Sequence, residues 1–331
     1  MAVTHSAPAP FDSLHPDAVF SAAESIGLEP SGRLFALNSY ENRVYQLGDE
    51  DGALWVLKFY RPARWSVAAI AEEHDFTFEL ADAELPVAAP LRRDGESLFK
   101  HGGLRFAAFP YLAGRAPELD DHATLTLLGR TLARIHAIGG RRRFAHRPVL
   151  TVERLGDSAR ELVLDSGFVP DALVEQYARV SEQIIGRVRQ SFDAFGVLPR
   201  LRIHGDCHAG NILWRESGPL FVDLDDCMSG PRIQDLWMFL SGDAATQQSS
   251  WAAVMEGYEL FAEFDYSELT LVESLRSLRI LHHAAWIAHR WGDPAFPRAF
   301  PWFGEARFWE RHISDLFEQM AAMDDPPILS K

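Results

Sequence analysis

Polar residues crowd into one short stretch of the chain, residues 204–211 (HGDCHAGN), between two apolar runs. Asp206 stands five positions before Asn211, and Asp223 directly follows the second apolar run, residues 220–222. Phosphoryl transfer uses this spacing, because one carboxylate orients or deprotonates the acceptor hydroxyl while an Asn and a second Asp bind magnesium. We therefore predict Asp206 and Asp223 as catalytic residues, and Asn211 and Asp223 as metal ligands.

The acidic cluster after that second run, Asp223, Asp225 and Asp226, supports a bound cation. Carboxylates and a nucleoside triphosphate repel one another, so a divalent cation is needed to hold them together. Oxygen ligands of this kind suit Mg²⁺, and a second metal ligand at Asp225 stays open. A zinc site built on His204, Asp206 and His208 is the alternative, since imidazole is a common zinc ligand.

An apolar run at residues 55–57 ends in Lys58, where a strand lysine would contact the α- and β-phosphates of ATP. A buried lysine is costly unless it is paired. The segment that follows offers two neighbouring glutamates, of which Glu73 shares the helical register of Phe76 and Leu80. We expect Lys58 and Glu73 to form that pair.

Strand patterns fill the first part of the chain, interrupted by a single helix. The predicted strands cover residues 34–37, 43–47, 54–59, 98–99 and 104–109, and the predicted helix covers residues 67–82. Residues 110–114 (PYLAG) look like a connector between two bodies. The N-terminal domain is therefore placed at residues 1–110, with residues 1–10 expected to be disordered.

Beyond the connector the apolar period changes to that of helices. Apolar stripes predict helices around 125–135 and 173–188, and further helices are expected near 232–241, 251–263, 269–291 and 305–322, with a loop at 293–297. Two short strands, 201–203 and 220–222, deliver the polar residues to one place. The fold class is α+β, with a mainly helical second domain over residues 111–331.

Composition narrows the classes of function. The 331 residues carry 32 Lys and Arg against 47 Asp and Glu, a net charge of −15, which argues against nucleic-acid or anionic-membrane partners. Two cysteines are too few for a disulfide framework, and neither a signal peptide nor a transmembrane run is evident. A cytoplasmic monomer is expected.

Several motifs together resemble a known group. The run LARIH at 132–136, the loop 204–211, the run FVD at 221–223 and the Asp-Leu pair at 235–236 resemble the aminoglycoside phosphotransferase and choline kinase group. The runs at 37–46 (LNSYENRVYQ), 56–62 (VLKFYRP), 85–90 (LPVAAP), 201–214 and 293–297 (DPAFP) are closer still to the stress response kinase A family.

The resemblance implies a bilobal protein-kinase-like fold, with ATP and Mg²⁺ as cofactors and transfer to Ser or Thr hydroxyls of a protein substrate in a cytoplasmic stress response. It also implies that Asp235 anchors the loop that carries Asp206. A small-molecule kinase acting on an amino alcohol or an aminoglycoside stays open as the alternative, as does a nucleotide-binding scaffold without turnover.

The departures from ordinary protein kinases matter as well. The glycine-rich phosphate loop is replaced by the turn 38–42 (NSYEN), so Ser39 and nearby backbone amides are expected to cover the phosphates. Tyr111, in the connector 109–112, is expected to contact the adenine. Cys207 and Cys227 adjoin acidic residues, which disfavours a reactive thiolate and hence a redox switch.

Overall fold

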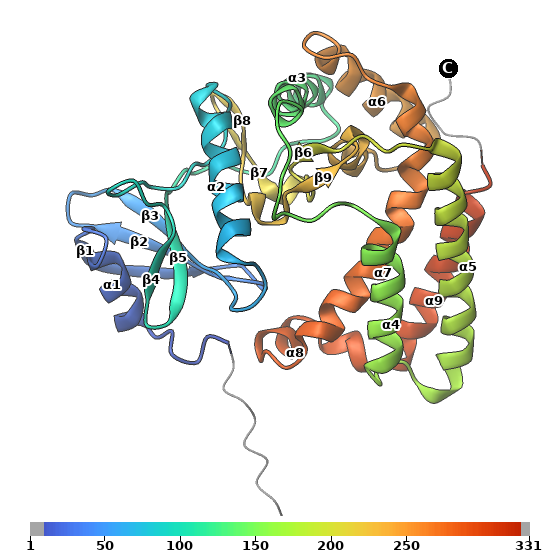
Figure 1. Ribbon diagram of the computed structural model, residues 1–331, viewed down its shortest axis with the longest axis horizontal. Coiled ribbons are helices and arrows are strands. Elements are labelled where there is room, and N and C mark those ends of the chain that lie inside the picture. The colour runs from blue at the N-terminus through green and yellow to red at the C-terminus, as the bar shows by residue number, and fades with distance from the viewer. Residues whose placement is uncertain (1–9, 326–331) are drawn as a thin grey trace, which may run out of the picture. The chain divides into compact units, whose positions relative to one another are not determined.

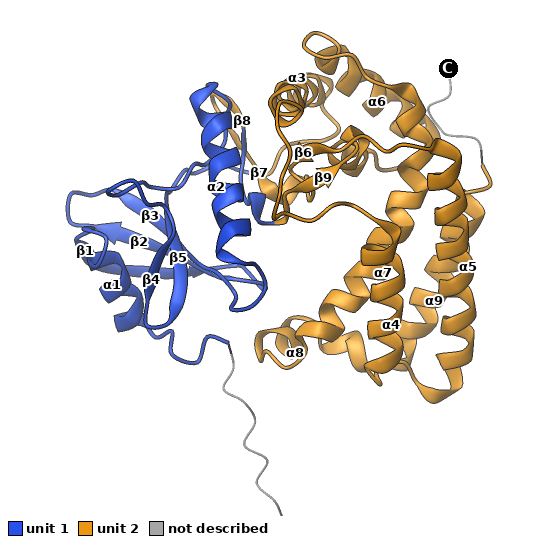
Figure 2. Ribbon diagram, viewed as in Figure 1, with its two compact units in different colours: residues 1–115, 220–225 blue, residues 116–219, 226–331 orange. Residues whose placement is uncertain are grey.

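The computed structural model describes residues 10–325, and the chain divides into two compact units (Figures 1 and 2). Unit 1 comprises residues 1–115 and 220–225, and unit 2 comprises residues 116–219 and 226–331. The disorder expected for residues 1–10 falls on residues 1–9, outside the described range, and on residue 10.

A five-stranded antiparallel sheet forms the centre of unit 1, in the order β1-β2-β3-β5-β4. Its strands are β1 (Pro30–Leu37), β2 (Arg43–Asp49), β3 (Leu54–Phe59), β4 (Phe99–His101) and β5 (Leu104–Pro110). Lys58, on the central strand, lies opposite Val44 of β2 and Ala107 of β5. The predicted strands are therefore confirmed, with β1 beginning four residues earlier than the apolar run at 34.

Two helices accompany this sheet. Helix α2 (Val67–Asp82) covers the predicted range and begins where the Ser66 hydroxyl accepts a hydrogen bond from the Ala69 amide. Ile70 of α2 packs in one apolar cluster with Ala107 of β5. Helix α1 (Pro16–Glu24) was not predicted, although Val19, Ala22 and Ala23 bury a clear apolar face.

The end of β8 (Gly218–Phe221) is held by hydrogen bonds within unit 1. The Phe221 amide donates to the Pro86 carbonyl at 2.8 Å, and the Ala88 amide donates to the Phe221 carbonyl at 3.1 Å. These two bonds fix the point from which the chain continues to Asp223.

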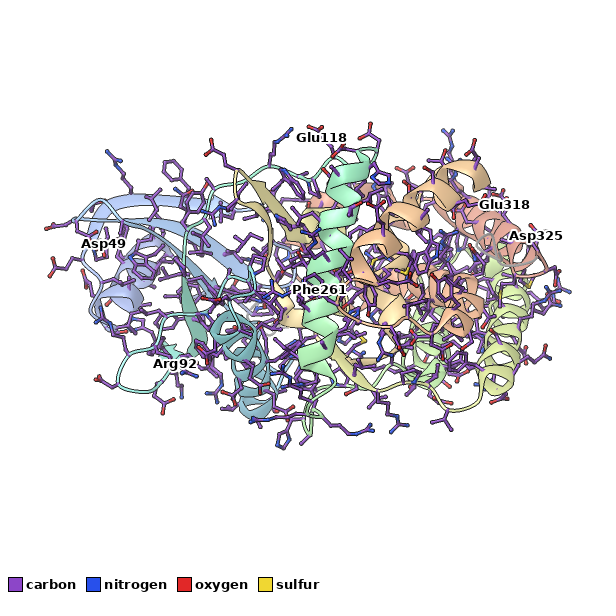
Figure 3. The ribbon with its side chains drawn as sticks, turned by 90° about the horizontal axis from the view of Figure 1, so that it is seen from above. Asp49, Arg92, Glu118, Phe261, Glu318 and Asp325 are labelled. Atoms are coloured by element: carbon purple, nitrogen blue, oxygen red, sulfur yellow. The ribbon has the colours of Figure 1, made fainter. Side chains whose placement is uncertain are left out.

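Unit 2 is mainly helical. Its helices are α3 (His122–Gly139), α4 (Ser158–Asp165), α5 (Asp171–Phe195), α6 (Ala244–Tyr258), α7 (Val272–Arg290), α8 (Ala295–Ala299) and α9 (Ala306–Ala322). Helices α4, α5, α7 and α9 pack on one another, and α3 packs along α6 (Figure 1). Phe261, just after α6 and labelled in Figure 3, lies beside α3, with its ring 5.8 Å from the Arg134 guanidinium.

Short strands carry the polar loop of unit 2. β6 (Leu201–Ile203) pairs antiparallel with β9 (Met228–Gly230), and β7 (Ile212–Arg215) follows the loop. All three residues of β6 are buried, which anchors the start of the loop in the core of the unit. Among residues 10–325, none of the helices combines the length and apolarity that crossing a membrane requires.

Two predicted segments were wrong. The helix expected at 232–241 is instead two 3₁₀ turns, Arg232–Asp235 and Trp237–Phe239. The Leu236 and Leu240 amides donate to carbonyls three residues back, at 3.0 Å each, as 3₁₀ geometry requires. Helix α8 begins within the loop expected at 293–297 and continues to residue 299. Asp293 accepts a hydrogen bond from the Ala295 amide, and Pro297 lies within the first turn, where its missing amide hydrogen costs nothing.

Candidate active site

Lys58 is the central cation of unit 1. Its ammonium lies 2.7 Å from Asp223 Oδ1, 3.5 Å from Asp225 Oδ1 and 3.7 Å from Glu73 Oε1. The Lys58 side chain is only 8% exposed, and that of Glu73 is 4% exposed. The pair that the sequence predicts is therefore present, and Asp223 joins it.

The charge of Lys58 is secured by these neighbours. Burial by itself lowers the pKa of a lysine, but the three carboxylates outweigh it and raise the pKa of Lys58 well above its ordinary value. Lys58 is therefore a permanent cation, as contact with phosphate oxygens requires.

Asp223, two residues after the end of β8, has an uncommon backbone conformation. Its φ of +58° lies in the left-handed region, which Asp tolerates better than most residues. Its side chain is 52% exposed, whereas Asp225 is buried. Of these two carboxylates, Asp223 is the accessible one, and oxygen ligands of this kind match the preference of Mg²⁺.

Asp225 contacts three polar side chains of unit 1. The Asn42 amide donates to its Oδ2 at 3.0 Å, and the Arg64 guanidinium forms an ion pair with the same oxygen. With Lys58 beside its other oxygen, Asp225 is engaged by cations of the protein itself. Its contacts tie the β1–β2 turn to the segment that carries Asp223.

The turn that replaces a glycine-rich loop is held by Arg61. The Arg61 side chain donates to the Glu41 carbonyl at 2.8 Å and to the Tyr40 carbonyl at 3.1 Å, and its amide donates to Asn42 Oδ1 at 3.1 Å. Sequence reasoning missed Arg61, Arg64 and Asn42 as a group, although Asn42 and Arg61 lie in the runs that carry the family resemblance.

The two other predicted nucleotide contacts lie in unit 1. Ser39 is half-buried in the β1–β2 turn, and no hydrogen bond found within residues 10–325 uses its hydroxyl. Tyr111 follows β5, and its amide donates to the Leu54 carbonyl at 2.9 Å, which fixes the start of the connector against β3.

In unit 2 the structure brings Asp206 and Asn211 together. The Asn211 side-chain amide donates to the Asp206 carbonyl at 2.9 Å and lies 3.5 Å from Oδ2 of the Asp206 carboxylate. His208 Nε2 lies 3.4 Å from the same oxygen, and Arg279 of α7 donates to Oδ1 at 2.6 Å. Sequence reasoning missed Arg279, because it lies 73 positions further along the chain.

These contacts set the charge of Asp206. Burial by itself would raise the pKa of Asp206, but His208 and Arg279 outweigh it and hold the pKa well below the usual range of a carboxyl. Asp206 is therefore ionised, which a residue that accepts a proton or orients a hydroxyl must be.

Asp235 holds the loop in place, as the resemblance implies. Its two carboxylate oxygens accept hydrogen bonds from the His204 and Gly205 amides, each at 2.8 Å. Gly205 has a φ of +85°, and an added Cβ would stand 2.3 Å from the Asp226 carbonyl oxygen. Only glycine fits this position.

A buried chain of hydrogen bonds continues from Asp235 into the helices. His136 Nε2 lies 3.2 Å from Asp235 Oδ2, and His136 Nδ1 lies 2.8 Å from the Tyr258 hydroxyl. The packing of α3 on α6 therefore determines where Asp235, and with it the loop, is held.

Cys207 and Cys227 are both buried free thiols. Burial, together with Asp235 and Asp206, raises the pKa of Cys207 well above its ordinary value, which disfavours the thiolate. Within residues 10–325, no three His, Cys, Asp or Glu side chains are arranged so that they could hold a metal ion.

Comparison with known proteins identifies the class of enzyme to which this chain belongs. Residues 34–272 match the model of a phosphotransferase enzyme family. The fold is similar to solved structures of an amicoumacin kinase, in complex with AMP-PNP and Ca²⁺, and of a microcompartment-associated aminopropanol kinase. The amicoumacin kinase has a TM-score of 0.74 and 18% identity, and the match covers 95% of this chain and 94% of that one. The aminopropanol kinase has a TM-score of 0.66 and 21% identity, and the match covers 90% of this chain and 98% of that one. Fold and site together define a phosphotransferase with a kinase-like fold.

Other proteins are much more similar to this chain in sequence than these two solved structures are. Stress response kinase A of Escherichia coli O157:H7 is 43% identical over 96% of each chain. A protein of Salmonella typhimurium named serine/threonine protein kinase RdoA is 43% identical over 96% of each chain. The chain belongs to the phosphotransferase enzyme family and, within it, to the stress response kinase A family.

Proposed function

We propose that this protein is an ATP- and Mg²⁺-dependent kinase that phosphorylates Ser or Thr hydroxyls of a protein substrate in a cytoplasmic stress response. The observation that carries the proposal is the pairing of Asp206 with Asn211 on a loop held by Asp235. The 43% identity with relatives named stress response kinase A and a serine/threonine protein kinase supports the choice of acceptor.

The residues of unit 1 bind the nucleotide in this proposal. Lys58, kept charged by Asp223, Asp225 and Glu73, contacts the α- and β-phosphates, and the amides of the β1–β2 turn with Ser39 cover them. Tyr111 and the connector contact the adenine. Asn211 and Asp223 are the ligands of Mg²⁺, which neutralises charge on the phosphates when it is bound.

Asp206 acts on the acceptor. Its carboxylate orients the hydroxyl and takes its proton, while the hydroxyl oxygen bonds to the γ-phosphorus and the bond to the β-phosphate oxygen breaks. The loop need not move to do so, because Asp235 and Asn211 already hold its backbone. Preorganisation of this kind is the main contribution of a protein to phosphoryl transfer.

The proposal is tested by transfer of labelled phosphate from ATP with Mg²⁺. We expect Asp206→Asn to lower the rate on protein Ser or Thr by about 10²- to 10⁴-fold, the usual contribution of a general base. The matched control is Asp193→Asn, which removes an exposed carboxylate on α5 and should leave the rate unchanged.

The same assay with different acceptors distinguishes a protein kinase from a small-molecule kinase. The protein itself and generic acidic and basic proteins are compared with choline, homoserine and an aminoglycoside. Asp206-dependent label on Ser or Thr supports the protein kinase. Label on small molecules alone overturns the protein substrate and supports the small-molecule alternative, and full turnover by Asp206→Asn refutes the role of Asp206.

A further inference from the structure

The carboxylate proposed as the base is held at both oxygens. Arg279 donates to Asp206 Oδ1 at 2.6 Å, while His208 and Asn211 lie 3.4 Å and 3.5 Å from Oδ2. An acceptor hydroxyl that approaches Oδ1 must take the place of the Arg279 guanidinium or share the oxygen with it. Arg279 is therefore placed to affect which acceptors are used.

Arg279 can leave this oxygen without disturbing the core. Its side chain is 45% exposed, and it extends from the surface of α7, whose buried residues include its neighbours Leu278 and Leu281. A guanidinium displaced from a carboxylate gains most by pairing with another anion, since charge-assisted hydrogen bonds are about twice as strong as neutral ones. Two anions approach Asp206 in the proposed mechanism, the γ-phosphate of ATP and an acidic group on the acceptor, and of these only the acceptor differs from one substrate to another.

Apart from Asp206, an imidazole and several aromatic rings lie near Arg279. Burial, with a smaller contribution from the charge of Arg279, lowers the pKa of His283, which lies one turn further along α7, and this favours the neutral imidazole. The ring centroids of His283 and Trp286 are 5.8 Å apart, and those of Trp286 and Phe300 are 5.7 Å apart. An amine beside the acceptor hydroxyl would meet the Arg279 guanidinium, and contact between like charges disfavours a cationic acceptor.

We infer that Arg279 selects acceptors that carry an acidic group next to the hydroxyl: a Ser or Thr flanked by Asp or Glu. The acidic group pairs with the guanidinium and draws it from Asp206, which exposes Oδ1 to the hydroxyl. Binding of the correct acceptor and release of the base are then one event. The inference rests on the proposed function, and it deepens that proposal by naming the substrate class.

The test compares three Ser peptides of one length whose neighbours on both sides of the Ser are Glu, Gln or Lys. We expect the wild type to prefer the Glu peptide over the Gln peptide in kcat/KM, and Arg279→Gln to reduce that preference by about 10- to 100-fold, the size of a charge-assisted pair. Arg279→Glu should favour the Lys peptide, and Arg279→Lys should keep part of the preference for Glu.

Arg311→Gln is the matched control, because it removes an exposed arginine from α9 and should leave the preference unchanged. Circular dichroism of each variant establishes that unit 2 is folded. A wild type that phosphorylates the three peptides equally, or an Arg279→Gln variant with an unaltered preference, overturns the inference while the proposed function stands.

A second set of acceptors separates this inference from the proposed function. Small hydroxy acids such as glycerate are compared with amino alcohols such as choline. Arg279-dependent transfer to hydroxy acids, with no transfer to peptides, overturns the protein substrate but supports the role of Arg279. Transfer to amino alcohols alone, or to none of the acceptors, overturns both.

Discussion

At the scale of single residues, the two charged groups at the centre of the proposed mechanism differ in their surroundings. Lys58 is almost fully buried and shares three carboxylates, so its partners stabilise a charge that burial would otherwise remove. Asp206 has a half-exposed arginine as its partner. Removing Lys58 would leave buried carboxylates uncompensated, whereas Arg279 can exchange one anion for another.

The burial of His74 leads to a prediction about how stability depends on pH. It lies on α2 between the Tyr60 hydroxyl and the Ser97 hydroxyl, each 2.8 Å from one of its ring nitrogens. Burial, with a further contribution from the charge of Lys58, lowers the pKa of His74 to about 3. The unfolded chain therefore binds a proton below about pH 6.5 that the folded protein does not bind.

Because of this difference, the free energy of unfolding depends on pH. The contribution of His74 is constant above the pKa of the unfolded chain, and the free energy of unfolding falls as the pH drops from about 6.5 towards 3, by up to about 1.4 kcal/mol per pH unit. We expect urea unfolding at pH 7, 6 and 5 to show this slope, and His74→Gln to reduce it. His312, with a pKa lowered to about 4 mainly by burial, contributes with the same sign and keeps part of the slope. An unaltered slope in His74→Gln would contradict the assignment.

At the scale of elements, the crossing of α3 and α6 positions the loop. A Cβ added to Gly129 of α3 would stand 1.9 Å from the Val254 carbonyl oxygen, and one added to Gly257 of α6 would stand 1.8 Å from the Thr126 carbonyl oxygen. The two backbones meet directly at these glycines. His136 and Tyr258, which continue the hydrogen bonds of Asp235, lie on the same two helices.

We expect Gly129→Ala to push these helices apart and to destabilise unit 2 by about 3 kcal/mol or more, because backbone atoms cannot yield as side chains do. Gly186→Ala is the matched control: Gly186 lies within α5 with open space around it, so the change should stabilise the protein by up to about 1 kcal/mol. Urea unfolding measures both variants. Equal effects at the two sites would show that the crossing is not close.

At the scale of the whole molecule, the net charge of the chain is −15, whereas the guanidinium of Arg279 is a local cation at the proposed acceptor site. Long-range repulsion slows the approach of an acidic acceptor, while the contact with Arg279 favours it once it is bound. The long-range effect is the one that salt removes, because the screening length falls from about 30 Å at 0.01 M to about 8 Å at 0.15 M salt.

We therefore expect kcat/KM for the Glu-flanked peptide to rise between these two salt concentrations, and kcat/KM for the Lys-flanked peptide to fall. Initial rates at both concentrations, with the Gln-flanked peptide as the neutral control, measure the two trends. A fall for the Glu-flanked peptide would show that the local contact dominates its approach.

The strands of unit 1, helix α2 and helix α9 were predictable, because their period-2 and period-3.6 patterns reflect burial on one face. Lys58 with Glu73 could be predicted too, since a buried strand lysine needs an acidic partner on the next element. The segment 232–241 was not predicted correctly, because a short apolar pattern does not separate an α-helix from successive 3₁₀ turns, and the local sequence gives no sign of a partner such as Glu268, 35 positions from Ile233.

The class of chemistry was predictable from the local sequence. Asp206 and Asn211 are held close by one short loop, and Asp223 directly follows an apolar run. Two contacts of the site were not predictable in this way: the ion pair of Arg64 with Asp225 and that of Arg279 with Asp206. These pairs join residues 161 and 73 positions apart, and nothing but the packing of whole elements brings such side chains together.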